Sequence, residues 1–221
     1  MILFWAKKVS LFFLGIFIMS FGVNFSVLSG LGVSPISSIP YTFSLVFAFD
    51  YGMMTAIIYC IYVLIQIIIL KKVYFRHFLQ IAASQAFGYF ITLGRIILSP
   101  IVPLPATYLT QLFYMFISVI LIAIGIFTYM NANIVSLPAD GLISIISTKL
   151  GRNFSSAKLI FDCSSVFLST VLSLIIFSSL KSVREGTIIA AVFVGLIMKI
   201  IEKIYDNFSK KTDVSKNSKN I

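Results

Sequence analysis

Residues 34–38 read Ser-Pro-Ile-Ser-Ser, and residues 136–141 read Ser-Leu-Pro-Ala-Asp-Gly. Each stretch begins a short apolar segment, the first running to Phe49 and the second to Leu150. Serine at the N-cap, proline in the first turn and a glycine just beyond the end are typical boundaries of a helix. A helix of about 15 residues is about 22 Å long, which is shorter than the roughly 30 Å hydrocarbon core of a bilayer. The sequence therefore predicts two short helices.

Six longer apolar segments accompany the two short ones, at about 9–28, 52–70, 78–97, 108–130, 157–180 and 186–204. Each is close to the ~20 apolar residues that a membrane-spanning helix needs. Charged residues make up 11% of the 221-residue chain and the mean hydropathy is +1.05, whereas about a quarter of a soluble domain is charged. We expect an all-α polytopic membrane protein with one transmembrane domain over residues 1–205, in which the first segment is retained as a helix and not cleaved as a signal peptide.

The two halves of the chain resemble each other. Equivalent residues are separated by 103 positions in Gly22–Gly125, Pro35–Pro138 and Cys60–Cys163, and by 107 positions in Gly88–Gly195. We interpret this as an internal duplication, with repeat 1 over about 5–98 and repeat 2 over about 107–205. Each repeat then contains a long, a short, a long and a further long helix.

The positions of the basic residues predict the orientation of the repeats. If the short helices are re-entrant and the N-terminus is cytoplasmic, all but three of the 17 Lys and Arg residues lie on the cytoplasmic side. If both short helices span the bilayer, five basic residues lie outside. The excess of basic residues in cytoplasmic loops favours the re-entrant alternative, in which the second repeat is inverted and both termini are cytoplasmic. Residues 206–221 are predicted to be a disordered basic tail.

Several classes of function are disfavoured by the composition. The net charge of +10 comes from basic residues that flank apolar segments, which is typical of membrane topology and not of nucleic-acid binding. The two cysteines have no metal-binding spacing, and the chain shows no catalytic triad, Walker loop or dinucleotide motif. We therefore expect no enzyme, no cofactor and no metal.

Asp140 lies near the start of the second short segment. A carboxylate there stabilises the helix dipole by about 0.3–1 kcal/mol, which would be a purely structural role. Acidic residues at membrane depth are also uncommon without a function, so Asp140 is a candidate cation or proton site. Lys158 and Asp162, four residues apart on one helix face, form either a structural pair or part of the same site.

The starts of the short helices offer a different kind of site. Their unpaired backbone N–H groups and partial positive charge suit an anion, but Ser34 and Ser136 could equally cap their own helices. Asn131 precedes the second short segment and could line a cavity or bond to another helix. Bonds between helices are also the expected role of Asn24, Gln66, Gln80 and Gln85.

Four short motifs follow one another along the chain: Gly32-Val33-Ser34-Pro35, Leu137-Pro138-Ala139-Asp140-Gly141, Lys158-x-x-x-Asp162, and Glu185-Gly186-Thr187-Ile188-Ile189 with Gly195. In this order they resemble the bacterial YitT/YczE-type membrane proteins, from Val9 to about Ile204. The chain departs from that pattern at Glu185, where a smaller residue is expected, and at residues 35–38, where a bulkier and more acidic run is expected. The resemblance implies a multi-pass protein of the bacterial inner membrane and supplies no substrate.

The repeat and the polar residues at membrane depth predict a secondary transporter or exporter of a small solute, with Asp140, Lys158 and Asp162 as its substrate or ion site and with Ser34, Ser136 and Asn131 as further candidates. Alternatives are a non-transporting accessory or assembly subunit, and a substrate-binding subunit of a larger transporter. The expected partners are the lipid bilayer and an unidentified small solute, and a homo-oligomer is left open.

Overall fold

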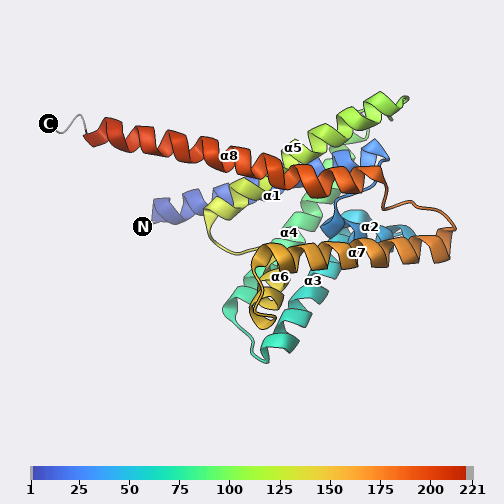
Figure 1. The fold of residues 1–221 in the computed structure, drawn as a ribbon, viewed down its shortest axis with the longest axis horizontal. Coiled ribbons are helices and arrows are strands. Elements are labelled where there is room, and N and C mark those ends of the chain that lie inside the picture. The colour runs from blue at the N-terminus through green and yellow to red at the C-terminus, as the bar shows by residue number, and fades with distance from the viewer. Residues whose placement is uncertain (1, 218–221) are drawn as a thin grey trace.

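The computed structural model describes residues 2–217, which form eight helices and no strands. In chain order the helices are α1 (Ile2–Ser29), α2 (Pro35–Val46), α3 (Tyr51–Leu70), α4 (Phe75–Leu98), α5 (Tyr108–Ala132), α6 (Pro138–Lys149), α7 (Phe154–Phe177) and α8 (Glu185–Asn217). Within the described residues, five of them, α1, α3, α4, α5 and α7, have the length and apolar composition needed to cross a membrane. The predicted all-α polytopic membrane protein is confirmed, and Figure 1 shows its arrangement.

Several features of the helices differ from the prediction. α8 continues as a helix to Asn217, past its predicted end near residue 204, because no glycine or proline follows Gly195 to stop it. The first part of the predicted disordered tail is therefore helical, and residues 218–221 of that tail lie outside the described residues. The glycine at position 52 lies inside α3 and does not end α2, whose C-cap is Phe47. The predicted span at about 186–204 is the beginning of α8 and is not among the five spans found in the described residues.

α1 and α5 cross in antiparallel orientation, and each makes the same kind of close contact with the other. A Cβ atom added to Gly22 of α1 would lie 2.8 Å from the backbone nitrogen of Ile122, and one added to Gly125 of α5 would lie 2.6 Å from the backbone nitrogen of Met19. The two contacts are equivalent under the shift of 103 positions. Small residues allow such close approach of membrane helices, and the equivalence supports a two-fold relation between the repeats.

The other helix pairs follow the same relation. α1 packs on α4 as α5 packs on α8, and each short helix packs on both α3 and α7. The halves α1–α4 and α5–α8 are therefore inverted repeats. One pair breaks the symmetry: α3 and α4 pack closely, whereas the described residues of α7 and α8 show no comparable packing.

Hydrogen bonds and an ion pair define one end of the bundle. Asp50 before α3 lies 2.9 Å from Arg95 near the end of α4, and the Gly186 amide of α8 donates to the Leu31 carbonyl just after α1 at 2.8 Å. We call this end, where α1 and α4 finish and α3 and α8 begin, the Arg95 end. α1 begins and α8 finishes on the opposite side (Figure 1).

Candidate functional site

Asp140 is the third residue of α6, and its Oδ2 atom accepts a 2.6 Å hydrogen bond from the hydroxyl of Tyr129 in α5. Tyr129 is buried, with 1% of its surface exposed, and Asp140 is half-buried. A charge-assisted bond of this kind is among the stronger ones in a protein. It ties the start of the short helix to the long helix before it and holds the carboxylate towards the interior.

Lys158 and Asp162 lie one turn apart on α7, as their spacing predicts, and their side chains form an ion pair. The ammonium nitrogen lies 3.2 Å from Asp162 Oδ2. The Asp162 side chain is only 16% exposed, and its second oxygen is buried with no hydrogen-bond partner among the described residues. A buried acceptor without a partner is costly in free energy, so this oxygen is available to a proton or a ligand.

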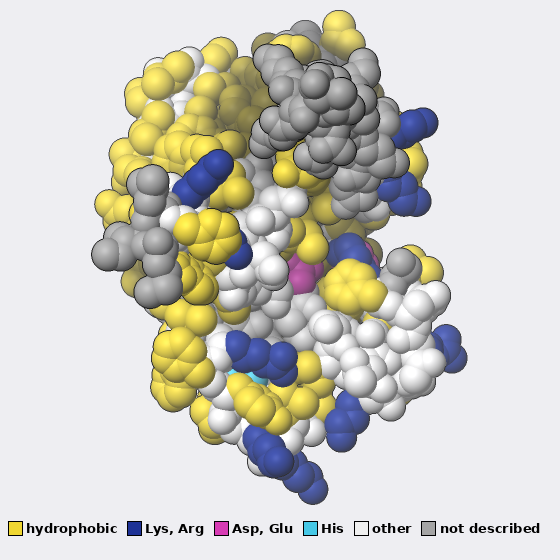
Figure 2. All heavy atoms as spheres, turned by 90° about the vertical axis from the view of Figure 1, so that its left-hand side faces the viewer, with side chains coloured by type: hydrophobic (Ala, Val, Ile, Leu, Met, Phe, Trp, Pro, Cys, Tyr) yellow, Lys and Arg dark blue, Asp and Glu magenta, His cyan; other side chains and the backbone are white. Residues whose placement is uncertain are grey.

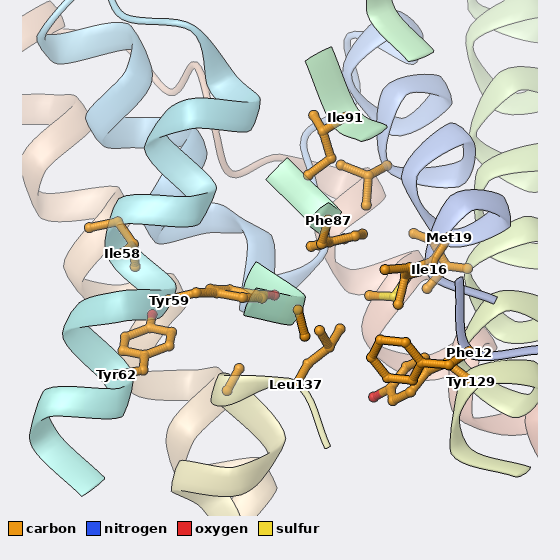
Figure 3. Packing of buried hydrophobic residues seen from close by; sticks show 14 of the residues in the cluster. Phe12, Ile16, Met19, Ile58, Tyr59, Tyr62, Phe87, Ile91, Tyr129 and Leu137 are labelled. Carbon is orange, nitrogen blue, oxygen red and sulfur yellow. The ribbon is translucent and has the colours of Figure 1, made fainter. Parts of the chain in front are cut away.

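Buried tyrosines lie beside the carboxylates. Tyr59 and Tyr62 of α3 stack with ring centroids 5.8 Å apart, and the Tyr62 hydroxyl is buried without a described partner. In Figure 3 the rings of Tyr59 and Tyr129 extend from α3 and α5 towards the start of α6, where Leu137 lies between them. Phenol hydroxyls can donate to a carboxylate or accept from a cation. The tyrosines therefore add adaptable polar groups to an apolar core.

We group Asp140 with the Lys158–Asp162 pair as the acidic cluster, because α6, which carries Asp140, packs on α7, although no described bond joins Asp140 to the pair. Figure 2, which views the molecule from the left-hand side of Figure 1, shows acidic and basic side chains next to each other in a hollow. Two carboxylates and one ammonium carry a net charge of about −1 when all three are ionised. The cluster therefore suits a proton or a cation better than an anion.

A second set of polar side chains positions α6. Gln66 of α3 donates to the Pro138 carbonyl at 3.0 Å, and Gln80 of α4 donates to the Ser136 carbonyl at 3.3 Å. Both glutamines are at most 2% exposed and line a polar cavity of about 160 Å³ together with Gly141. The Gln80 bond satisfies a carbonyl of the extended segment before α6, and the Gln66 bond reaches the first residue of the helix itself. Gln66 joins α3 to α6 as predicted, whereas Gln80 joins α4 to the extended segment before α6.

The structure does not bring the other three candidate residues into the acidic cluster by any described bond. Ser34 donates to the hydroxyl of Ser37 at 3.0 Å and does not cap α2 through its side chain. Ser136 has an exposed side chain and precedes the N-cap of α6, which is Leu137, because the helix begins directly at Pro138. Asn131 is exposed and donates to the carbonyl of Phe127 in its own helix at 3.0 Å.

Sequence reasoning missed two features of the site region. The tyrosines at 59, 62 and 129 carried no signal, because tyrosine within an apolar helix is also common in packing. Asp50 was overlooked as the N-cap of α3, where it accepts from the Met53 amide at 3.1 Å and pairs with Arg95. An aspartate directly before an apolar run was the available signal.

Comparison with known proteins identifies a family without a known activity. No curated protein and no solved structure matches the chain significantly. A family model described as a family of unknown function, DUF6198, matches residues 6–203, which includes nearly all of both repeats. The chain therefore belongs to this family of unknown function, DUF6198.

Proposed function

We propose that this protein is a secondary transporter or exporter of a small solute, and that Asp140, Asp162 and Lys158 form its substrate or coupling-ion site. The observation that carries the proposal is the half-buried pair of carboxylates between a short helix and a long helix of an inverted repeat. Inverted repeats with short or broken helices are the architecture of many secondary transporters. Acidic side chains at membrane depth are rare and commonly mark ion or proton pathways.

The charges of the cluster support a cation or a proton as one of the transported or coupled species. Lys158 neutralises Asp162 in part, and Asp140 has a neutral phenol as its partner. An unpaired carboxylate at membrane depth costs about 2.5–3.5 kcal/mol on insertion scales. Binding of a cation or a proton relieves that cost, so occupancy of the site stabilises the surrounding helices.

The proposal includes the cellular setting. We place the protein in a bacterial inner membrane with both termini in the cytoplasm, on the basis of the basic residues near the predicted cytoplasmic ends and of the resemblance to YitT/YczE-type proteins. The solute and the surrounding lipid are then its partners, and no cofactor is required.

Thermal unfolding of the purified full chain tests the site. Li⁺, Na⁺, K⁺ and small organic amines are added at constant ionic strength, and the midpoint is followed over a pH series. A species that binds the folded state raises the midpoint by several degrees. D140N and D162N are expected to lose the increase, whereas E185Q, at an exposed carboxylate outside the cluster, keeps it. An equal response in all four proteins would rule out the assigned site.

Flux measurements test transport itself. The same proteins, reconstituted into liposomes, are assayed for movement of the species that stabilised the wild type. Uptake by the wild type and E185Q but not by D140N or D162N is expected. Binding without flux would contradict the transporter assignment while leaving the site intact.

The accessory-subunit alternative is favoured by an apolar groove of about 700 Å³ between α5 and α8. Its lining includes Leu109, Phe113, Phe116 and Phe193, and such a surface suits a transmembrane helix of another protein. Purification of the full chain in mild detergent from its native membrane discriminates the two functions. A stoichiometric partner that is lost in F113A/F116A supports the accessory role.

A further inference from the structure

α3 and α4 cross through two glycines in repeat 1. A Cβ atom added to Gly88 of α4 would lie 2.5 Å from the Gly52 carbonyl oxygen and 2.9 Å from the Ala56 Cβ atom. Gly195, 107 positions after Gly88, holds the equivalent place in α8, yet no described atom lies within 4 Å of its added Cβ. A glycine inside a membrane helix is typical of a close crossing. In this conformation Gly195 has no helix against it.

We propose that α8 closes on α7 in a second conformation, with Gly195 at the crossing point. The other close contacts of the first repeat, including those with the partner repeat, have equivalents in the second, so the missing pair is α7 with α8. The two helices are joined by a connection of only residues 178–184, which keeps α7 within reach. In inverted-repeat proteins one repeat can take up the arrangement of the other, which exchanges the open and closed sides.

Closure would change the surroundings of Asp162. Its equivalent in repeat 1 is Tyr59, which is 2% exposed and packs against Phe87 of α4 with ring centroids 6.0 Å apart. The equivalent of Phe87 is Val194, so closure would place an apolar side chain over the carboxylate of Asp162. Asp162 is paired with Lys158, but burying even a paired carboxylate costs desolvation free energy, so α8 closes more readily when Asp162 is protonated. That closure of α8 occludes a transport site depends on the proposed function. The closure itself depends only on the repeat.

Cross-linking between one native and one introduced cysteine tests closure directly. Gln85 of α4 contacts Cys60 of α3 at 3.5 Å between Nε2 and Sγ, and the equivalent positions are Val192 of α8 and Cys163 of α7. C60A/V192C is treated in detergent or nanodiscs with a methylene-bridged bis-methanethiosulfonate. C163A/Q85C is the matched positive control, and C60A/F193C, with the thiol in the groove next to α5, is the negative control. Mass spectrometry separates links within one chain from links between chains.

The expected result is an intramolecular link between Cys163 and the thiol introduced at 192, formed more slowly than in the positive control. Adding D162N to C60A/V192C is expected to raise the cross-linking rate about tenfold. Adding G195L is expected to abolish the link without loss of folded protein, because the space beside Gly195 is open in this conformation. The proposal is overturned if the positive control reacts and C60A/V192C does not, or reacts only between chains. The latter would mean that the Gly195 face of α8 packs on a second copy.

The same data separate this inference from the proposed function. A link whose rate does not respond to D162N establishes the helix motion and removes its coupling to the site. A link that does respond, in a protein that binds no cation and shows no flux, supports closure and overturns transport.

Discussion

The phenol of Tyr129 in α5 donates a 2.6 Å hydrogen bond to the carboxylate of Asp140 in α6. The equivalent residues of repeat 1, 103 positions earlier, are Ser26 and Ser37. The Ser26 hydroxyl donates instead to the Gly32 carbonyl at 3.1 Å. The backbone is duplicated, but the acid and the phenol are found in only one copy, so the chemistry of the site belongs to repeat 2.

Y129F should lower the unfolding free energy by about 1–3 kcal/mol, because a bond to a charged group is lost in a buried place. The free energy is measured by reversible denaturation in mixed micelles. D140N should cost clearly less in the Y129F background than alone, since both changes remove the same bond. Strict additivity of the two changes would contradict the bond.

G141A should destabilise the protein by about 1 kcal/mol, because the added methyl would displace the Gln80 amide and weaken its bond to the Ser136 carbonyl. Its control is G195A, where space is open and alanine favours the helix by about 0.5–1 kcal/mol. Thermal midpoints of both variants are compared with the wild type. In G141A/Q80A the cost should be less than the sum of the single changes, and a cost equal to that sum would argue against the predicted clash.

D50A should cost more than R95A. Asp50 caps α3 through the Met53 amide and also pairs with Arg95, so its loss removes about 1–3 kcal/mol. The Arg95 side chain is 61% exposed, and exposed ion pairs contribute less than about 1 kcal/mol. Denaturation midpoints give the comparison. Equal costs would show that the ion pair, and not the cap, stabilises this end.

Single cysteines at Lys71 and Arg152 should both be protected from an impermeant thiol reagent in intact cells, after Cys60 and Cys163 have been replaced. α3 leaves the Arg95 end and finishes at Leu70, and the antiparallel second repeat brings the start of α7 to the same side. A cysteine at Arg184 should be labelled as the control. Labelling at position 71 with protection at 152 would mean that both short helices span the membrane.

Helix positions could be predicted well from the sequence because capping signals and apolar lengths are local. The short helices begin within one or two residues of the serines that mark them, at Pro35 and Pro138. The end of α8 was predicted poorly, since polar composition was interpreted as disorder although no residue there breaks a helix. The inverted relation of the repeats was predicted only by counting basic residues. In the structure it depends on the crossing of α1 and α5 at Gly22 and Gly125, and such contacts between distant segments cannot be seen in either segment alone.

The candidate site was predicted in part. Lys158 and Asp162 pair as their spacing on one helix requires, because i and i+4 positions share a face. The proximity of Asp140 to Asp162 depends on how α6 packs on α7, which no periodicity encodes. Asn131 lies on the outward side of α5 and bonds within its own helix. Which side of the helix it occupies depends on the rotation of α5 and not on the residue type.

The α1–α5 crossing is an interface that does not require the two halves to be joined in one chain. Because the contact of Gly22 with Ile122 is the same as that of Gly125 with Met19, two separate copies of a single half could make it, provided that one is inserted upside down. One half of the chain can therefore carry acidic residues that the other lacks, at no cost to the shared interface.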